Sequence, residues 1–130
     1  MHKAITIAMV LLAVVSGNAA AEWVPAGRNT LFTAYYDPAT IRNVGNTVGM
    51  LHLYDFNNPK QNAIGETYYS SLEQDEFDCK EQRVRILGFS WHSEHMGKGA
   101  VVNIEADVDR WLPVPPKSIY AALWKVACEQ

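Results

Sequence analysis

The chain has 130 residues and carries 14 acidic against 11 basic side chains, a formal net charge of −3. This length allows one domain with a modest core and is too short for two. The sequence contains no basic stripe, which argues against binding to nucleic acid and makes an anionic membrane surface a poor partner.

The first 21 residues predict a cleavable export signal. Lys3 precedes an apolar run from Ala4 to Val15, and small residues follow as far as Ala21. This order is typical of a signal peptide, and the run is shorter than the roughly 20 apolar residues of a membrane-spanning helix. We therefore expect a signal peptide over 1–21 and one domain over 22–130, with an uncleaved membrane anchor as the alternative.

The residue before the expected cleavage site bears on where the exported chain resides. Neither Ala21 nor any other residue at this site is a cysteine, so no lipid anchor is expected. Cleavage would also remove the apolar run, so no membrane span is expected in the processed chain. We expect export through the inner membrane, to the periplasm, the cell surface or the medium.

The two cysteines, Cys79 and Cys128, are expected to form a disulfide bond, because paired cysteines are common in exported proteins. The bond closes a loop of about 50 residues, for which the chain-entropy estimate is roughly 4 kcal/mol of stabilisation. Two free thiols with a redox or metal role are the alternative, but their separation is unlike a CxxC motif.

Most of the exported part predicts β-strands. Segments rich in aromatic and branched residues indicate strands over 22–26, 31–36, 47–56 and 100–104. Residues typical of turns separate them, as at Asn43–Asn46. Asn57–Pro59 is expected to end the third of these strands, since a proline cannot donate a hydrogen bond to the neighbouring strand.

The clearest hairpin joins Thr67–Asp78 to Arg83–His92. A turn at Lys80-Glu81 aligns two acid–base pairs across the strands: Asp78 with Arg83, and Glu76 with Arg85. Phe77 and Cys79 then share the other face. Opposite charges on facing strands contribute about 0.2–1 kcal/mol per pair, so we interpret this acidic cluster as cross-strand ion pairs and not as catalytic carboxylates.

The apolar face of the second hairpin strand changes side halfway along the strand. By the same register, Leu87, Phe89 and Trp91 fall on the face of the arginines, where they would form an apolar patch of a few hundred Å². A bulge near Gly88 would turn them to the other face. We prefer cover by the segment Trp111–Pro113, with a homodimer second. If exposed, Trp91 is the best candidate for a ligand-binding residue.

The C-terminal segment predicts a helix with Ser118 as its N-cap. Its apolar residues repeat with helical spacing: Ile119, Ala122, Leu123, Val126 and Ala127. Ten residues are too few for a stable isolated helix, so it must dock on the sheet. The predicted fold is α+β, a single antiparallel sheet of about six strands with a C-terminal α-helix packed on one face and tied to it by the disulfide.

The nearest approach to a metal site is the segment His92–His95. His92, Glu94 and His95 could bind zinc or copper, with His52 as a distant fourth candidate. Their spacing is not HExxH, and the segment lies at a strand end beside a glycine-rich turn, so we interpret it as a solvated turn. No GxSxG or complete phosphate-loop motif is present, and the sequence predicts neither an enzyme nor a cofactor.

Several short motifs occur in the order typical of one family. They are Tyr36-Asp37-Pro38 with Ile41, Glu76–Cys79 with Arg83–Arg85, Met96-Gly97 with Gly99, Trp111 with Pro113, Ser118-Ile119, and Cys128. By these the chain resembles the surface-adhesin protein E family of proteobacteria. The resemblance covers nearly all of the expected exported domain.

The resemblance implies an antiparallel sheet with a C-terminal helix on its concave face, tied down by a disulfide. It also implies a non-enzymatic module of the cell envelope that binds host extracellular-matrix and plasma proteins, such as vitronectin and laminin, and that can dimerise. A periplasmic structural or accessory protein without a host ligand is the alternative.

Overall fold

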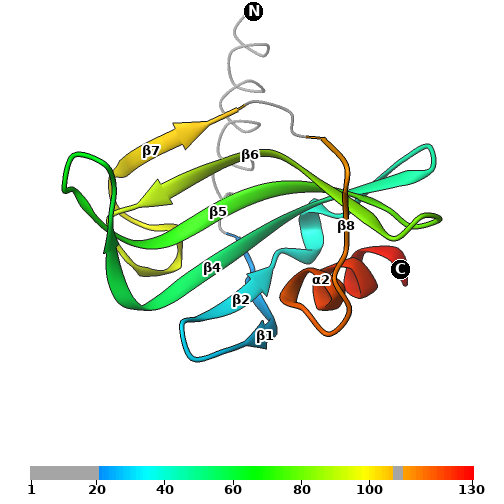
Figure 1. Ribbon diagram of the computed structural model, residues 1–130, viewed down its shortest axis with the longest axis horizontal. Helices are drawn as coiled ribbons and strands as arrows, with labels where there is room; N and C mark the ends of the chain where they lie inside the picture. The colour runs from blue at the N-terminus through cyan, green and yellow to red at the C-terminus, as the bar shows by residue number, and fades with distance from the viewer. Residues whose placement is uncertain (1–20, 107–109) are drawn as a thin grey trace, which may run out of the picture.

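A computed structural model describes residues 21–106 and 110–130. The expected signal peptide, apart from Ala21, lies outside the described residues. The described part forms one curved antiparallel sheet with a short C-terminal helix packed against one of its faces (Figure 1). No helix in these two ranges is both long enough and apolar enough to span a bilayer.

Eight strands make up the sheet. Six follow in the order β1-β2-β4-β5-β6-β7, while β3 pairs with β4 and β8 pairs with β6. The elements are β1 Val24–Arg28, β2 Phe32–Tyr36, η1 Pro38–Thr40, β3 Arg42–Val44, β4 Thr47–Gln61, β5 Thr67–Asp78, β6 Arg83–His92, η2 His95–Gly97, β7 Val101–Glu105, β8 Leu112–Pro113 and α2 Ile119–Cys128. The predicted fold class is confirmed.

The core lies between α2 and one face of the sheet, which we call the helix face. Its fully or nearly fully buried apolar residues come from β4, β5, β6 and α2: Val48, Met50, Phe77, Val84, Leu123 and Ala127. Side chains alternate along a strand, and Val48 pairs with Phe77 across β4 and β5. Residues 48, 50, 52 and 54 of β4 and residues 71, 73, 75 and 77 of β5 therefore all point to the helix face.

Helix α2 begins as the sequence predicts. The backbone N–H of Ala121 donates to Oγ of Ser118 at 3.0 Å, which caps the helix. At its other end, Cys128 forms the expected disulfide bond with Cys79, which follows β5 directly. A helix of ten residues is thus held by its cap, by its apolar stripe and by a covalent bond to the sheet.

The register of the β5–β6 hairpin is the one that the charges predict. Asp78 pairs with Arg83 and Glu76 with Arg85, with nitrogen–oxygen distances of 2.6 and 2.7 Å. Both pairs lie on the face opposite the helix. Trp111 stacks there on the two guanidinium groups, with its ring centre 5.3 Å from Arg83 and 4.7 Å from Arg85. The prediction that the Trp111 segment covers Phe89 and Trp91 is therefore wrong.

A bulge in β6 accounts for the change of face. Gln74 pairs with Gly88 and Asp75 with Ile86, so Leu87 is one residue more than β5 can match. Because a strand has a repeat of two, one extra residue turns all later side chains over. Phe89 and Trp91 consequently lie on the helix face. The bulge removes the reason for placing a second chain over them, and the homodimer stays a prediction.

The end of β4 differs from the expectation. The strand continues past Asn57 and through Pro59 to Gln61. Its pairing with β5 is interrupted after Asp55 and resumes where Lys60 pairs with Tyr68. Pro59 falls in the interruption, where no hydrogen bond to β5 is required of it. The extended strand brings Lys60 beside the aromatic side chains described next.

Candidate functional site

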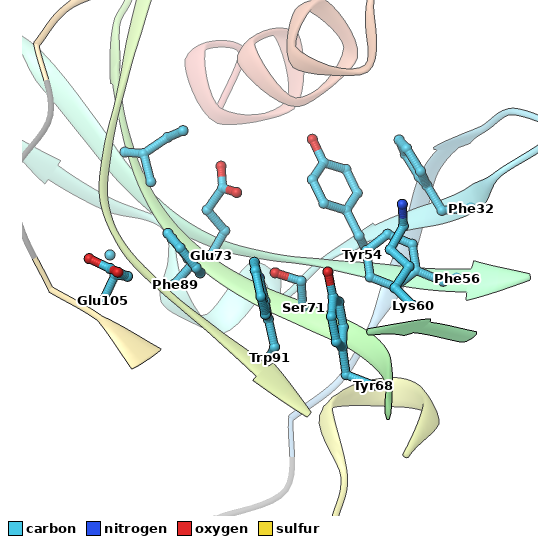
Figure 2. A pocket seen from close by; sticks show the side chains of 12 residues that line it. Phe32, Tyr54, Phe56, Lys60, Tyr68, Ser71, Glu73, Phe89, Trp91 and Glu105 are labelled. Carbon is cyan, nitrogen blue, oxygen red and sulfur yellow. The ribbon is translucent and has the colours of Figure 1, made fainter. Parts of the chain in front are cut away.

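A pocket of about 550 Å³ opens on the helix face, beside α2 (Figure 2). Half of its lining residues are aromatic, and these aromatic residues come from the four neighbouring strands β2, β4, β5 and β6. The lining consists of Phe32, Tyr54, Phe56, Lys60, Tyr68, Ser71, Glu73, Ile86, Gly88, Phe89, Trp91 and Glu105. We call it the aromatic pocket.

Three rings form a stacked row along one side of the aromatic pocket. The ring centres of Tyr68 and Trp91 are 4.4 Å apart with planes 11° from parallel, and Phe89 continues the row 5.6 Å from Trp91. Figure 2 shows these rings side by side, with Tyr54 and Phe32 facing them. Trp91 and Phe89 are half-buried, so the row offers a flat apolar surface to a ligand. The predicted ligand-binding candidate Trp91 is its central member.

The glycine beside the bulge is required by close backbone packing. A Cβ atom at Gly88 would lie 2.8 Å from the carbonyl oxygen of Glu105, which belongs to the adjacent β7. Gly88 also lines the aromatic pocket. The bulge and this glycine together let β7 approach while Phe89 and Trp91 turn inward.

The charged side chains of the pocket differ in their surroundings. Nζ of Lys60 lies 5.1 Å from the ring centre of Phe56, a distance suited to a cation–π interaction. Glu73 is only 8% exposed and accepts a hydrogen bond from the hydroxyl of Tyr120 in α2. Burial, with Asp75 nearby, raises the pKa of Glu73 to about 8. Near neutral pH this carboxyl therefore holds its proton, and the wall of the pocket there is polar but uncharged.

Glu73 also belongs to a group of polar side chains beneath the pocket, which we call the buried cluster: His52, Tyr54, Glu73, Asp75 and Tyr120. Nδ1 of His52 contacts Oδ2 of Asp75 within hydrogen-bond distance, and both side chains are fully buried. Nε2 of His52 lies 3.9 Å from Oε1 of Glu73. The His52 ring packs edge-on to Tyr54 and Tyr120, at centre distances of 4.5 and 5.9 Å.

Burial sets the protonation of this cluster. It lowers the pKa of His52 to about 4 and raises the pKa of Asp75 to about 8, because the interior disfavours the charged form of each. It also raises the pKa of Tyr54 and of Tyr120. Burial therefore favours the neutral form of each of these side chains.

The predicted weak metal candidates do not come together. Nε2 of His92 lies 2.8 Å from Oγ of Ser90, on the face opposite the helix, while Nδ1 of His95 lies 3.0 Å from the carboxylate of Asp55. Within residues 21–106 and 110–130, the group of His, Cys, Asp and Glu side chains close enough to share one ion consists of His52, Glu73 and Asp75. His92, Glu94 and His95 contribute nothing to it.

Sequence reasoning missed Glu73 and Asp75 and gave His52 only a distant role. The sequence did carry one indication of this cluster, namely polar residues at strand positions that point to the helix face. His52 lies between Met50 and Tyr54 on β4, and Asp75 lies two residues before Phe77 on β5. Such positions normally carry apolar side chains. The signal needed the β4–β5 register, in which His52 pairs with Glu73.

These observations define a class of protein: a small disulfide-tied domain of one antiparallel sheet and one helix, with an aromatic pocket beside the helix. The family profile described as Surface-adhesin protein E matches residues 23–129, and the chain belongs to this family. No curated protein matches the sequence significantly.

The fold is similar to solved structures of protein E from Haemophilus influenzae. One has a TM-score of 0.67 at 11% identity and covers 86% of this chain and 87% of that chain. A second, from a non-typeable strain, has a TM-score of 0.65 at 13% identity, covering 86% and 78%. A third structure, crystal form II of protein E, has a TM-score of 0.63 at 11% identity, covering 85% of this chain and 97% of that chain. At such low identity the likeness concerns the fold.

Proposed function

We propose that this chain is an exported, non-enzymatic protein-binding module of the bacterial cell envelope, and that its aromatic pocket binds a segment of a host extracellular-matrix protein. The observation that carries the proposal is the row of stacked rings formed by Tyr68, Trp91 and Phe89, of which Trp91 and Phe89 are half-buried. Membership of the surface-adhesin family supports it. The signal-peptide pattern of residues 1–21 supports export with cleavage after Ala21.

The chemistry of the pocket fits a protein ligand. Large aromatic side chains supply much of the binding energy at protein interfaces, and the strongest contributions lie in central apolar pockets with a polar rim. Here the row of rings is the apolar part, and Lys60 and Glu105 are charged side chains of the same lining. A ligand segment with one apolar side chain for the row and polar groups for these two charges would match it.

Binding to immobilised laminin and vitronectin tests the proposal. We expect Trp91→Ala to weaken binding at least tenfold, because a buried aromatic contact at an interface is commonly worth about 2 kcal/mol or more. Trp111→Ala is the matched control, since Trp111 stacks on arginines on the face opposite the helix. Equal loss in both variants, or retained binding in Trp91→Ala with its fold intact by circular dichroism, would contradict the proposal.

Cell fractionation tests the location. We expect the processed chain at the cell surface, where an antibody added to whole cells reaches it, or in the medium. Mass spectrometry of the purified chain should give an N-terminus at Glu22. Recovery only in the soluble periplasmic fraction would favour the accessory role without a host ligand.

A further inference from the structure

Two polar atoms of the buried cluster have no hydrogen-bond partner in the described part of the chain: Nε2 of His52 and Oδ1 of Asp75. Both residues are 0% exposed. Unpaired polar atoms at this depth are uncommon in proteins and point to a missing partner. Nε2 of His52 faces the carboxyl of Glu73, so the missing partner of the imidazole is to be sought between these two side chains.

The spacing there suits a metal ion. Ligand atoms of His52, Glu73 and Asp75 all lie within 4.8 Å of one another, and Nε2 of His52 is 3.9 Å from Oε1 of Glu73. Metal–nitrogen and metal–oxygen bonds of about 2.0–2.2 Å place two ligand atoms of one ion roughly 3–4 Å apart. An ion between His52 and Glu73 therefore needs only a small adjustment of the side chains.

We propose that the buried cluster binds a divalent transition-metal ion, with Nε2 of His52 and the carboxylate of Glu73 as direct ligands and Asp75 as the residue that orients His52. With Asp75 deprotonated, Nδ1–H donates to its carboxylate and the Nε2 lone pair is free, which is the usual arrangement of a carboxylate supporting a metal-bound histidine. The hydroxyl of Tyr120 supports Glu73 in the same way.

The types of ligand and their charges restrict which metal ions the site would bind. One imidazole with carboxylate oxygen suits Zn²⁺ or Mn²⁺ better than a thiophilic ion. A charge of +2 balances the two carboxylates of Glu73 and Asp75. Glu73 lines the aromatic pocket, so the ion enters from that side, and water from the pocket completes its coordination shell.

Metal binding must displace protons. The titratable groups that face the site are His52 and Tyr54 from β4, Glu73 and Asp75 from β5, and Tyr120 from α2. A carboxyl binds a metal ion only in its deprotonated form, so binding of the ion by Glu73 should release a proton to the buffer.

The test uses the full folded chain after removal of metal by chelator. Calorimetric titration with ZnCl₂, and separately with MnCl₂, should show one ion per chain. His52→Gln should abolish the binding, and Asp75→Asn should weaken it ten- to a hundredfold. His95→Gln is the matched control and should leave the binding unchanged. His95 lies in η2, away from the cluster, where it contacts Asp55 of β4.

A second measurement does not depend on the folding of the variants. In the wild-type chain, the NMR signals of the His52 ring should shift on addition of ZnCl₂ while those of His95 stay in place, and the melting temperature should rise. The proposal is overturned if neither ion binds, if the binding persists in His52→Gln, or if the signals of His95 respond and those of His52 do not. It does not depend on the proposed function, because matrix binding can be lost or kept independently of the metal.

Discussion

Phe77→Ala should lower the free energy of unfolding by about 3–5 kcal/mol, whereas Phe89→Ala should lower it by about 1 kcal/mol. Both phenylalanines lie on the helix face of neighbouring strands. Phe77 is 0% exposed and packs against Leu123 and Ala127 of α2, while Phe89 is half-buried in the wall of the aromatic pocket. Truncation leaves a cavity at the first position and only enlarges an existing pocket at the second.

Urea unfolding followed by circular dichroism measures both effects on the same chain background. The comparison tests whether the row of rings is available for binding or is part of the core. If Phe89→Ala costs as much as Phe77→Ala, the aromatic pocket is core and its proposed role in binding fails.

Replacing both cysteines by serine should lower the free energy of unfolding by about 2–4 kcal/mol. The disulfide bond joins residues 49 positions apart and ties the end of α2 to the end of β5. Without it the unfolded chain gains conformational freedom, and a helix of ten residues keeps only its cap and its apolar stripe. For a domain of this size, such a loss is a large fraction of the total stability.

The double variant Cys79→Ser, Cys128→Ser avoids a lone reactive thiol, and urea unfolding of this variant and of the oxidised wild-type chain under the same conditions gives the difference. The contacts of Leu123 with the sheet should persist, so the variant should remain folded but melt at lower temperature. Titration of the wild-type chain with a thiol reagent should find no free thiol. Two reactive thiols in protein isolated from the periplasm would contradict the assignment.

Features that depend on local pattern followed from the sequence. The charges of Glu76, Asp78, Arg83 and Arg85 defined the register of the β5–β6 hairpin because its turn is short and a strand has a strict repeat of two. The helical spacing after Ser118 defined α2 and its buried stripe. The pair of cysteines, with the predicted export signal, indicated the disulfide bond that joins this hairpin to α2.

The candidate site was decided by the tertiary structure. One extra residue at Leu87 moves Phe89 and Trp91 to the helix face, and the same sequence read without a bulge places them on the other. Trp111 packs on two arginines, although the apolar composition of the segment Trp111–Pro113 was equally compatible with packing over Trp91. Each of these outcomes depends on a small difference in packing that periodicity does not encode.

The buried cluster is the clearest example of a feature that the sequence pattern alone does not predict. His52 and Asp75 are 23 residues apart, and their contact depends on the register between β4 and β5. That register could not be counted from a turn, because pairing is interrupted between Asp55 and Lys60 and a longer loop follows. The sequence by itself determined which residues form strands, the hairpin and the helix. Only the tertiary structure determined which polar side chains meet beneath the aromatic pocket, because long-range strand pairing sets their distance.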